Sequence, residues 1–165
     1  MVHGRLVAVV VALAAVVAAP AQAANPACSS RALDVWLNTQ GSGTAAGSSY
    51  YKLEFTNLSA HTCTLRGYPG VSAIAANGRQ LGSAGGRNSA HPTRTVALPR
   101  GGSAVAVLQI TDAHNFPPSS CRLVTAAGIR VYAPGTTEAK TVPFPFPTCA
   151  KAGRVTLHTE SVQRQ

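Results

Sequence analysis

Short stretches of alternating apolar and polar residues recur along the chain, and turn residues separate them. Residues 31–38 (RALDVWLN), 50–58 (YYKLEFTNL) and 154–160 (RVTLHTE) follow this pattern. A period of two is typical of β-strands with one buried face. It places Leu53 and Phe55 toward the core and Glu54 toward solvent. Residues 103–110 (SAVAVLQI) are apolar on both faces, which favours a strand in the centre of a sheet.

The turn residues support the same architecture. Asn77-Gly78 is a strong hairpin signal and predicts a type I′ turn, which needs a positive φ at both central residues. Segments 99–102 (PRGG) and 134–135 (Pro-Gly) indicate two more connections, and residues 41–49 and 82–92 are expected to be flexible loops. We therefore expect an all-β fold, a single antiparallel β-sandwich of about eight or nine strands.

Residues 143–147 read PFPFP, with prolines at alternate positions. Three prolines at this spacing remove backbone donors along one side of a strand only. The segment is expected to be a protected edge strand whose two phenylalanines point inward. A polyproline segment offered to a partner is the alternative.

The first residues predict export. Arg5 precedes fifteen residues without a charge, and the small residues of AQA (21–23) follow, which is the pattern of a secretory signal peptide over residues 1–23. The apolar run is shorter than the ~20 residues that a membrane span needs, although a retained anchor is the alternative. Residues 24–165 would form one secreted domain, in the envelope or outside the cell, without a transmembrane segment.

The chain is basic. Without Arg5 it carries 13 basic and 5 acidic side chains, a net charge of +8, and most of the positive charges are isolated arginines. This balance favours contact with an anionic envelope polymer or glycan, or it is simply a solvated surface. The absence of a basic run and of an aromatic-basic signature argues against specific nucleic-acid binding.

Four cysteines in an exported chain predict two disulfides, for which three connectivities exist. No two of them are close in sequence, as zinc ligands would be, so neither a metal nor another cofactor is expected. Cys28 follows Asn25 and Pro26, which does not fit a lipid attachment site.

Candidate catalytic residues are few. Asp112 and His114 with an unspecified serine could form a hydrolase site, but no G-x-S-x-G motif is present. Asp34, Glu54 and Glu160 fall on predicted solvent faces, which disfavours a paired-carboxylate site. The single tryptophan, Trp36, faces away from the predicted core, so it is either a packing residue or a sugar-stacking contact.

The segment 55–71 (FTNLSAHTCTLRGYPGV) resembles the hallmark of domain-of-unknown-function family 4232, small exported proteins of high-GC bacteria. The resemblance extends over nearly all of residues 24–165 and implies an immunoglobulin-like β-sandwich without an assigned activity. Many members are lipoproteins, and this chain lacks their lipidation cysteine. The motif is a scaffold in this interpretation, with a strand that ends at Asn57. In the rest of the motif, Gly67 would allow a close approach of the backbone to a neighbour. Tyr68, Pro69 and Gly70 would form a turn, and the Tyr68 hydroxyl would be hydrogen-bonded to the backbone.

We choose the pairing Cys28–Cys63 and Cys121–Cys149, which closes the two shortest loops and agrees with the resemblance. The leading hypothesis is an exported, non-enzymatic β-sandwich that binds a partner. The alternatives are a secreted hydrolase that uses Asp112 and His114 and a carbohydrate-binding module centred on Trp36.

Overall fold

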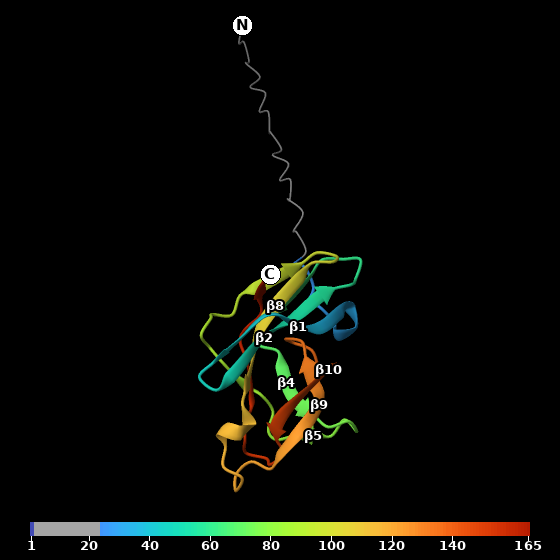
Figure 1. Cartoon of the computed structure of the whole chain (residues 1–165). Coiled ribbons are helices and arrows are strands. Elements are labelled where there is room, and N and C mark those ends of the chain that lie inside the picture. Colours follow the sequence, from blue (N-terminus) through green and yellow to red (C-terminus); the bar gives the residue numbers. More distant parts are fainter. Residues whose placement is uncertain (2–23) are drawn as a thin grey trace.

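The computed structural model describes Met1 and residues 24–165, so the predicted signal peptide lies outside the described residues. The described part is almost entirely β-structure (Figure 1). Its twelve strands, three of which have two residues, exceed the eight or nine expected. They are β1 (Leu33–Ala45), β2 (Ser48–Asn57), β3 (Cys63–Arg66), β4 (Gly70–Ile74), β5 (Gln80–Leu81), β6 (Gly86–Arg87), β7 (Thr95–Leu98), β8 (Ser103–Thr111), β9 (Leu123–Tyr132), β10 (Ala139–Cys149), β11 (Leu157–Thr159) and β12 (Gln163–Arg164).

The only helical segments in the described residues are two 3-10 turns of three residues each, η1 (Ser30–Ala32) and η2 (Ala113–Asn115). No helix there is long enough to span a membrane. Asp112 caps η2, because its carboxylate accepts a hydrogen bond from the His114 backbone. Both turns connect or precede strands rather than forming a layer of their own.

The larger sheet has the strand order β1-β2-β8-β11-β6, and β12 also pairs with β8. The central position predicted for residues 103–110 is therefore confirmed, since β8 pairs with β2 on one side and with β11 and β12 on the other. The expectation of a purely antiparallel fold is wrong between β11 and β6, which are parallel, and at the isolated parallel bridge between Ala27 and Thr64.

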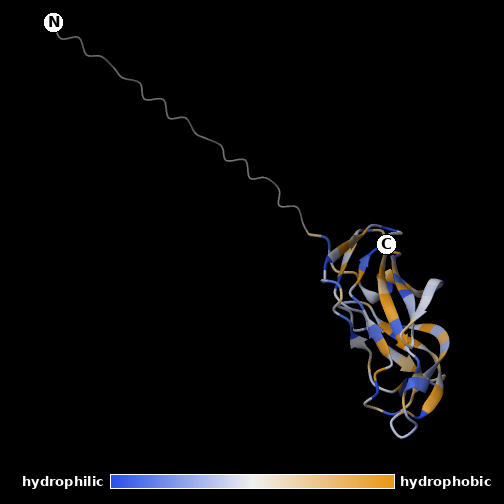
Figure 2. Cartoon of the chain, turned by 60° about the vertical axis from the view of Figure 1, so that its left-hand side comes forward, coloured by the Kyte–Doolittle hydropathy of each residue, from blue (hydrophilic) through white to orange (hydrophobic). Residues whose placement is uncertain are grey.

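A second sheet has the order β10-β9-β4-β5, and β3 pairs with β7 separately. Apolar side chains of the two larger sheets form one core, and apolar and polar residues alternate along the strands (Figure 2). The alternation predicted for β1 is confirmed: Leu33 and Val35 are buried, and Trp36 is 42% exposed.

The solvent-facing position predicted for Glu54 is wrong. Its side chain is buried, and it accepts hydrogen bonds from the amides of Asn38 (2.6 Å) and Gln165 (3.4 Å). The reason is that β12 pairs with β8, the strand next to β2. Gln165, the residue after β12, therefore reaches Glu54 on the face of the sheet that also carries Trp36. A strand far away in sequence therefore covers a residue that local alternation places in water.

The hairpins differ from their predicted geometry. Gly78 has a positive φ of 78°, but Asn77 does not, so the β4–β5 hairpin is not a type I′ turn. Instead, Ala46 (φ 47°) and Gly47 (φ 70°) join β1 to β2, with Ala45 opposite Ser48. Two positive φ values in a two-residue connection are the type I′ pattern. Residues 41–49 are thus mostly a hairpin, not a flexible loop.

The second predicted loop, residues 82–92, is also partly ordered against the sheet. It contains β6, and the Gly85 backbone N–H donates to the Val71 carbonyl at 2.7 Å. A Cβ on Gly85 would collide with the Val71 side chain, so only glycine fits this close approach. The glycine at this position therefore allows close packing rather than flexibility.

The PFPFP segment lies in β10, which pairs only with β9 among the described strands, so its prediction as an edge strand is confirmed. Phe146 is buried and Phe144 is partly buried, while the three prolines are exposed. The pairing shifts register between Pro143 and Phe146, which marks a β-bulge. Gly128 on β9 lies opposite, where a Cβ would lie 2.6 Å from the Val142 carbonyl oxygen.

Both predicted disulfides are present, Cys28–Cys63 and Cys121–Cys149, and the described residues contain no free cysteine. The first joins the segment before η1 to the start of β3, and the second joins the chain after η2 to the end of β10. The four cysteine side chains are buried.

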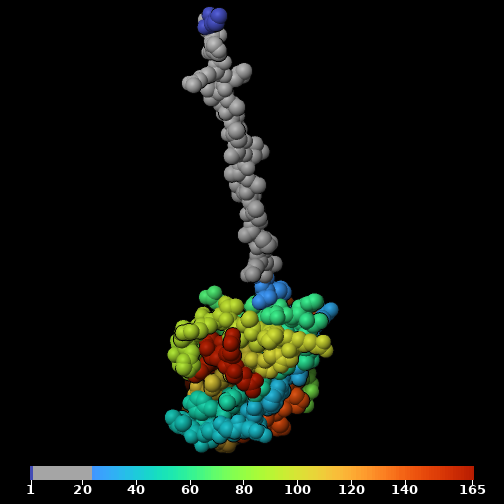
Figure 3. All heavy atoms as spheres, turned by 90° about the horizontal axis from the view of Figure 1, so that it is seen from above, coloured from blue at the N-terminus to red at the C-terminus, as the bar shows by residue number. Residues whose placement is uncertain are grey.

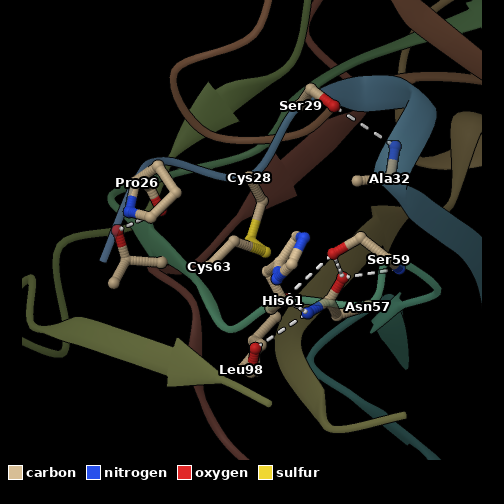
Figure 4. Close-up of a disulfide and its surroundings, with 10 residues drawn as sticks. Pro26, Cys28, Ser29, Ala32, Asn57, Ser59, His61, Cys63 and Leu98 are labelled. Atoms are coloured by element: carbon tan, nitrogen blue, oxygen red, sulfur yellow. Dashed lines mark hydrogen bonds between the residues drawn. A yellow bond between two sulfur atoms is a disulfide. The ribbon is translucent and has the colours of Figure 1, made fainter. Parts of the chain in front are cut away.

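The 55–71 motif is a scaffold whose centre is Asn57 (Figure 4). This fully buried side chain donates to the carbonyl oxygens of His61 and Leu98, each at 2.8 Å. Its own carbonyl accepts from the backbone N–H and hydroxyl of Ser59, at 2.9 and 2.7 Å. Asn57 therefore closes the turn between β2 and β3 and links it to β7.

The rest of the motif departs from two expectations. Gly67 has a φ of 108° and open space where a Cβ would be, so it is required for its backbone conformation and not for a close approach. Among the described hydrogen bonds none involves the Tyr68 hydroxyl; the Arg87 guanidinium lies 5.6 Å from the ring centroid instead. Pro69 is buried, and its carbonyl accepts from the Thr159 hydroxyl at 2.9 Å; Gly70 begins β4.

Candidate functional site

A groove with a volume of about 590 Å³ lies where the β1–β2 hairpin approaches β10. We call it the hairpin groove. Its walls come from residues 44–49, the end of β8 with the η2 turn, and the PFPFP segment of β10. The groove thus joins segments that are far apart in sequence.

One side of the hairpin groove is aromatic. The Tyr51 ring on β2 meets Phe144 on β10 edge to face, with ring centroids 5.0 Å apart. Phe144 in turn stacks against Phe146 at 6.1 Å. Such offset and edge-to-face pairs are the favoured aromatic geometries and hold the rings in place. Pro145 and Pro147 extend this apolar surface to the exposed rim.

Other residues that line the groove are polar. The His114 ring Nδ1 lies 2.7 Å from the Asp112 carboxylate, and both side chains are more than half exposed. The backbone N–H of His114, and then its ring, lower the pKa of Asp112 below its usual value. Asp112 is anchored in addition through its backbone N–H, which donates to the Gly47 carbonyl at 2.9 Å. The groove therefore presents an oriented carboxylate–imidazole pair.

Gly47 is the residue that sequence analysis missed at this site. Its φ of 70° closes the β1–β2 hairpin, and its carbonyl accepts from both the Asp112 backbone and the Asn115 amide. A Cβ on Gly47 would clash with the Asn115 side chain. The sequence signal for this hairpin is the Ala46-Gly47 dipeptide between two alternating segments. Asn77-Gly78 is the stronger hairpin signal, so the type I′ turn was predicted there instead.

The structure brings Asp112 and His114 together, as a hydrolase would require, but it does not add a nucleophile. Among the described residues no serine hydroxyl is hydrogen-bonded to the His114 ring. Ser48 and Ser49 line the same groove, and the Ser48 hydroxyl accepts a hydrogen bond from the Gln109 amide at 3.0 Å. The pair is thus placed to bind polar groups, and no complete triad is assembled around it.

The other sequence candidates lie apart from the groove. Trp36 is on the outer face of β1, opposite the buried Glu54, and does not line the groove. The remaining acids have partners away from the groove: Glu138 meets Arg31 at 3.5 Å, Glu160 meets His91 at 3.5 Å, and Asp34 accepts a hydrogen bond from the Val35 backbone N–H. In the described part of the chain, no cluster of three or more acids, histidines or cysteines could hold a metal ion.

A family model, the domain of unknown function DUF4232, matches residues 28–163. The chain belongs to this family. The matched region begins at the first disulfide cysteine and extends into β12, so it contains the whole scaffold and both walls of the hairpin groove. Neither a curated protein nor a solved structure matches the chain.

Proposed function

We propose that this DUF4232 chain is an exported, non-enzymatic binding domain with an immunoglobulin-like β-sandwich fold, and that the hairpin groove holds its ligand, a glycan outside the cytoplasm. The observation that carries the proposal is the pairing of an aromatic wall with an oriented polar pair in one groove of about 590 Å³. Ligand sites commonly combine apolar walls with a few placed polar groups.

The chemistry of the two walls favours sugars. Tyr51, Phe144 and the exposed proline rings offer flat apolar faces, which suit the C–H faces of a sugar ring. Asp112 can accept hydrogen bonds from sugar hydroxyls, and the ring of His114 can donate or accept. The pair is held by contacts to the backbone, so little side-chain freedom is lost on binding.

Export is supported by the signal-peptide pattern at residues 1–23 together with the two disulfides, which persist in oxidising compartments. The net charge of +8 for residues 24–165 would keep such a domain close to anionic envelope polymers. The domain would therefore act in the envelope or outside the cell.

The test is a titration of the purified protein with neutral soluble oligosaccharides, for example chitotetraose and maltotetraose, followed by amide chemical shifts. We expect shifts at residues 44–49, 110–114 and 144–147, and at least a fivefold loss of affinity in His114→Ala. The matched control is Trp36→Ala, which should bind as the parent does. Loss of binding in Trp36→Ala alone would favour the Trp36-centred module and reject the groove.

A second candidate, hydrolysis, is favoured by the 2.7 Å contact between Asp112 and His114 beside Ser48 and Ser49. An assay with p-nitrophenyl acetate separates it from binding. We expect the same slow background for the parent and for His114→Ala. Turnover that His114→Ala and Ser49→Ala both abolish would establish the enzyme and reject the non-enzymatic proposal.

A further inference from the structure

The segment between β6 and β7 is fastened to the last strands of the chain. The Asn88 backbone N–H donates to the Thr159 carbonyl at 2.8 Å. The Ser161 hydroxyl lies 3.4 Å from the carbonyl oxygens of both His91 and Pro92. These contacts connect residues 88–92 to residues 159–161, which lead into β12.

A cavity of about 510 Å³ lies between these two segments, and we call it the arginine pocket. Figure 3 shows the C-terminal residues (red) directly beside the yellow-green segment that leads into β7. Basic and polar side chains dominate the lining, in contrast to the hairpin groove. The lining side chains are those of His91, Arg94, Thr95, Gln163 and Arg164, with Pro92 and Val96.

The two arginines of the pocket carry charge that no carboxylate balances. Ion pairs in the described residues are limited to Arg31–Glu138, His91–Glu160 and His114–Asp112. The other two acids, Asp34 and Glu54, hydrogen-bond a backbone N–H and two side-chain amides, respectively. Glu160 pairs with His91, which lines the pocket, and the side chain of Glu160 is only 16% exposed.

From these observations we infer that the arginine pocket binds the phosphate group of an anionic ligand through Arg94 and Arg164. Each guanidinium presents five N–H donors in a planar fork that matches phosphate oxygens. Two such groups in one pocket supply more donors than the two oxygens of a carboxylate can accept, while a phosphate offers further oxygens. The Thr95 hydroxyl and the Gln163 amide line the same cavity and can complete the hydrogen bonds.

The arginine pocket is separate from the hairpin groove, because the two lie at opposite ends of β8. β12 pairs with β8 at Ala104 and Val105, whereas the groove is lined by Ile110 and Thr111. Strand rise places these positions roughly 20 Å apart. Phosphate binding therefore neither requires nor tests the glycan proposal.

The experiment measures binding of inorganic phosphate and of a linear polyphosphate of defined length to the purified protein at 0.15 M salt. Inorganic phosphate tests whether the pocket binds a single phosphate group. Polyphosphate tests whether it binds a phosphate group that is part of a polymer. Amide chemical shifts of the parent protein locate the site without any substitution. We expect saturable shifts at residues 88–95 and 161–165 with both probes.

Two double variants separate a site from general charge. Arg94→Gln/Arg164→Gln should lose at least tenfold in polyphosphate affinity. The control, Arg79→Gln/Arg122→Gln, removes the same charge from two exposed arginines that form no ion pair among the described residues, and should lose less than threefold. Melting temperatures within a few degrees of the parent establish that both variants are folded.

Several results would overturn the inference. Equal losses in the two double variants would mean that the net charge alone attracts the polymer. Shifts that rise linearly with phosphate, or that fall outside residues 88–95 and 161–165, would mean that no phosphate site exists there. Displacement of phosphate by polyglutamate at equal charge concentration would assign the pocket to carboxylates instead.

Discussion

Replacing Asn57 by alanine should strongly destabilise the protein. The side chain is fully buried and makes four hydrogen bonds, two donated and two accepted. Its removal leaves the buried Leu98 carbonyl without that donor, which costs about 1–3 kcal/mol, and each other lost bond contributes about 0.5–1.5 kcal/mol. We therefore expect the free energy of unfolding to fall by about 4 kcal/mol.

Urea unfolding of the oxidised protein measures this change by linear extrapolation. Domains of this size have roughly 5–15 kcal/mol in total, so the variant should be marginal but folded, with a melting temperature about 10–15 °C lower. Ser59→Ala is the matched control. It removes two hydrogen bonds of the same turn from a half-buried position that water can reach, and should cost about 1 kcal/mol.

Asn57→Asp sharpens the test. It keeps the shape and the acceptor but has no amide protons to donate to the carbonyls of His61 and Leu98. At neutral pH it should be at least as destabilising as alanine, because a buried carboxylate then faces two carbonyl oxygens. Near-parental stability of Asn57→Asp, or equal losses in Asn57→Ala and Ser59→Ala, would refute the role assigned to the amide.

Three further results are expected. Replacing both cysteines of either disulfide by serine should lower the free energy of unfolding by about 3.5–4 kcal/mol, because the loops span 35 and 28 residues. Urea unfolding measures this change, and a decrease of less than about 1 kcal/mol would contradict the loop-entropy argument. Pro145→Val should fold but self-associate in sedimentation velocity, since an N–H returns to an edge strand; a strictly monomeric variant would count against this. The carboxyl of Asp112 should titrate in NMR below its ordinary value of 3.8, so its stabilising contribution is complete above about pH 4 and is lost as pH falls through the lower pKa. His114→Ala should restore the pKa only in part, because the backbone N–H remains, and an unshifted parent value would disprove the capping contact.

The sequence predicted the strands well where burial depends on one face of one strand. The alternation in β1 and the apolar pattern of β8 both led to the correct placement, because a buried face imposes a period of two. Glu54 was placed wrongly because its burial depends on β12 and on the partners Asn38 and Gln165, which no local pattern connects to it.

The turns show a similar limit. Asn77-Gly78 carries the stronger local preference for a type I′ turn, but the structure places that turn at Ala46-Gly47. An alanine at positive φ is unfavourable by itself. It is accepted here because hydrogen bonds from Asp112 and Asn115 hold the Gly47 carbonyl. Local propensity therefore gave the residue types that turns use, and tertiary contacts decided which turn adopts which geometry.

The sequence identified the polar pair of the hairpin groove, Asp112 and His114, but neither proposed site as a whole, because each combines segments whose proximity depends on strand register. The two disulfides connect to these same segments. Cys121–Cys149 fastens the chain after His114 to the end of β10 and so joins two walls of the hairpin groove. Cys28–Cys63 fixes the start of β3, whose partner β7 begins at Thr95 in the arginine pocket. The covalent links that stabilise the fold are therefore connected to the strands and turns that carry both sites.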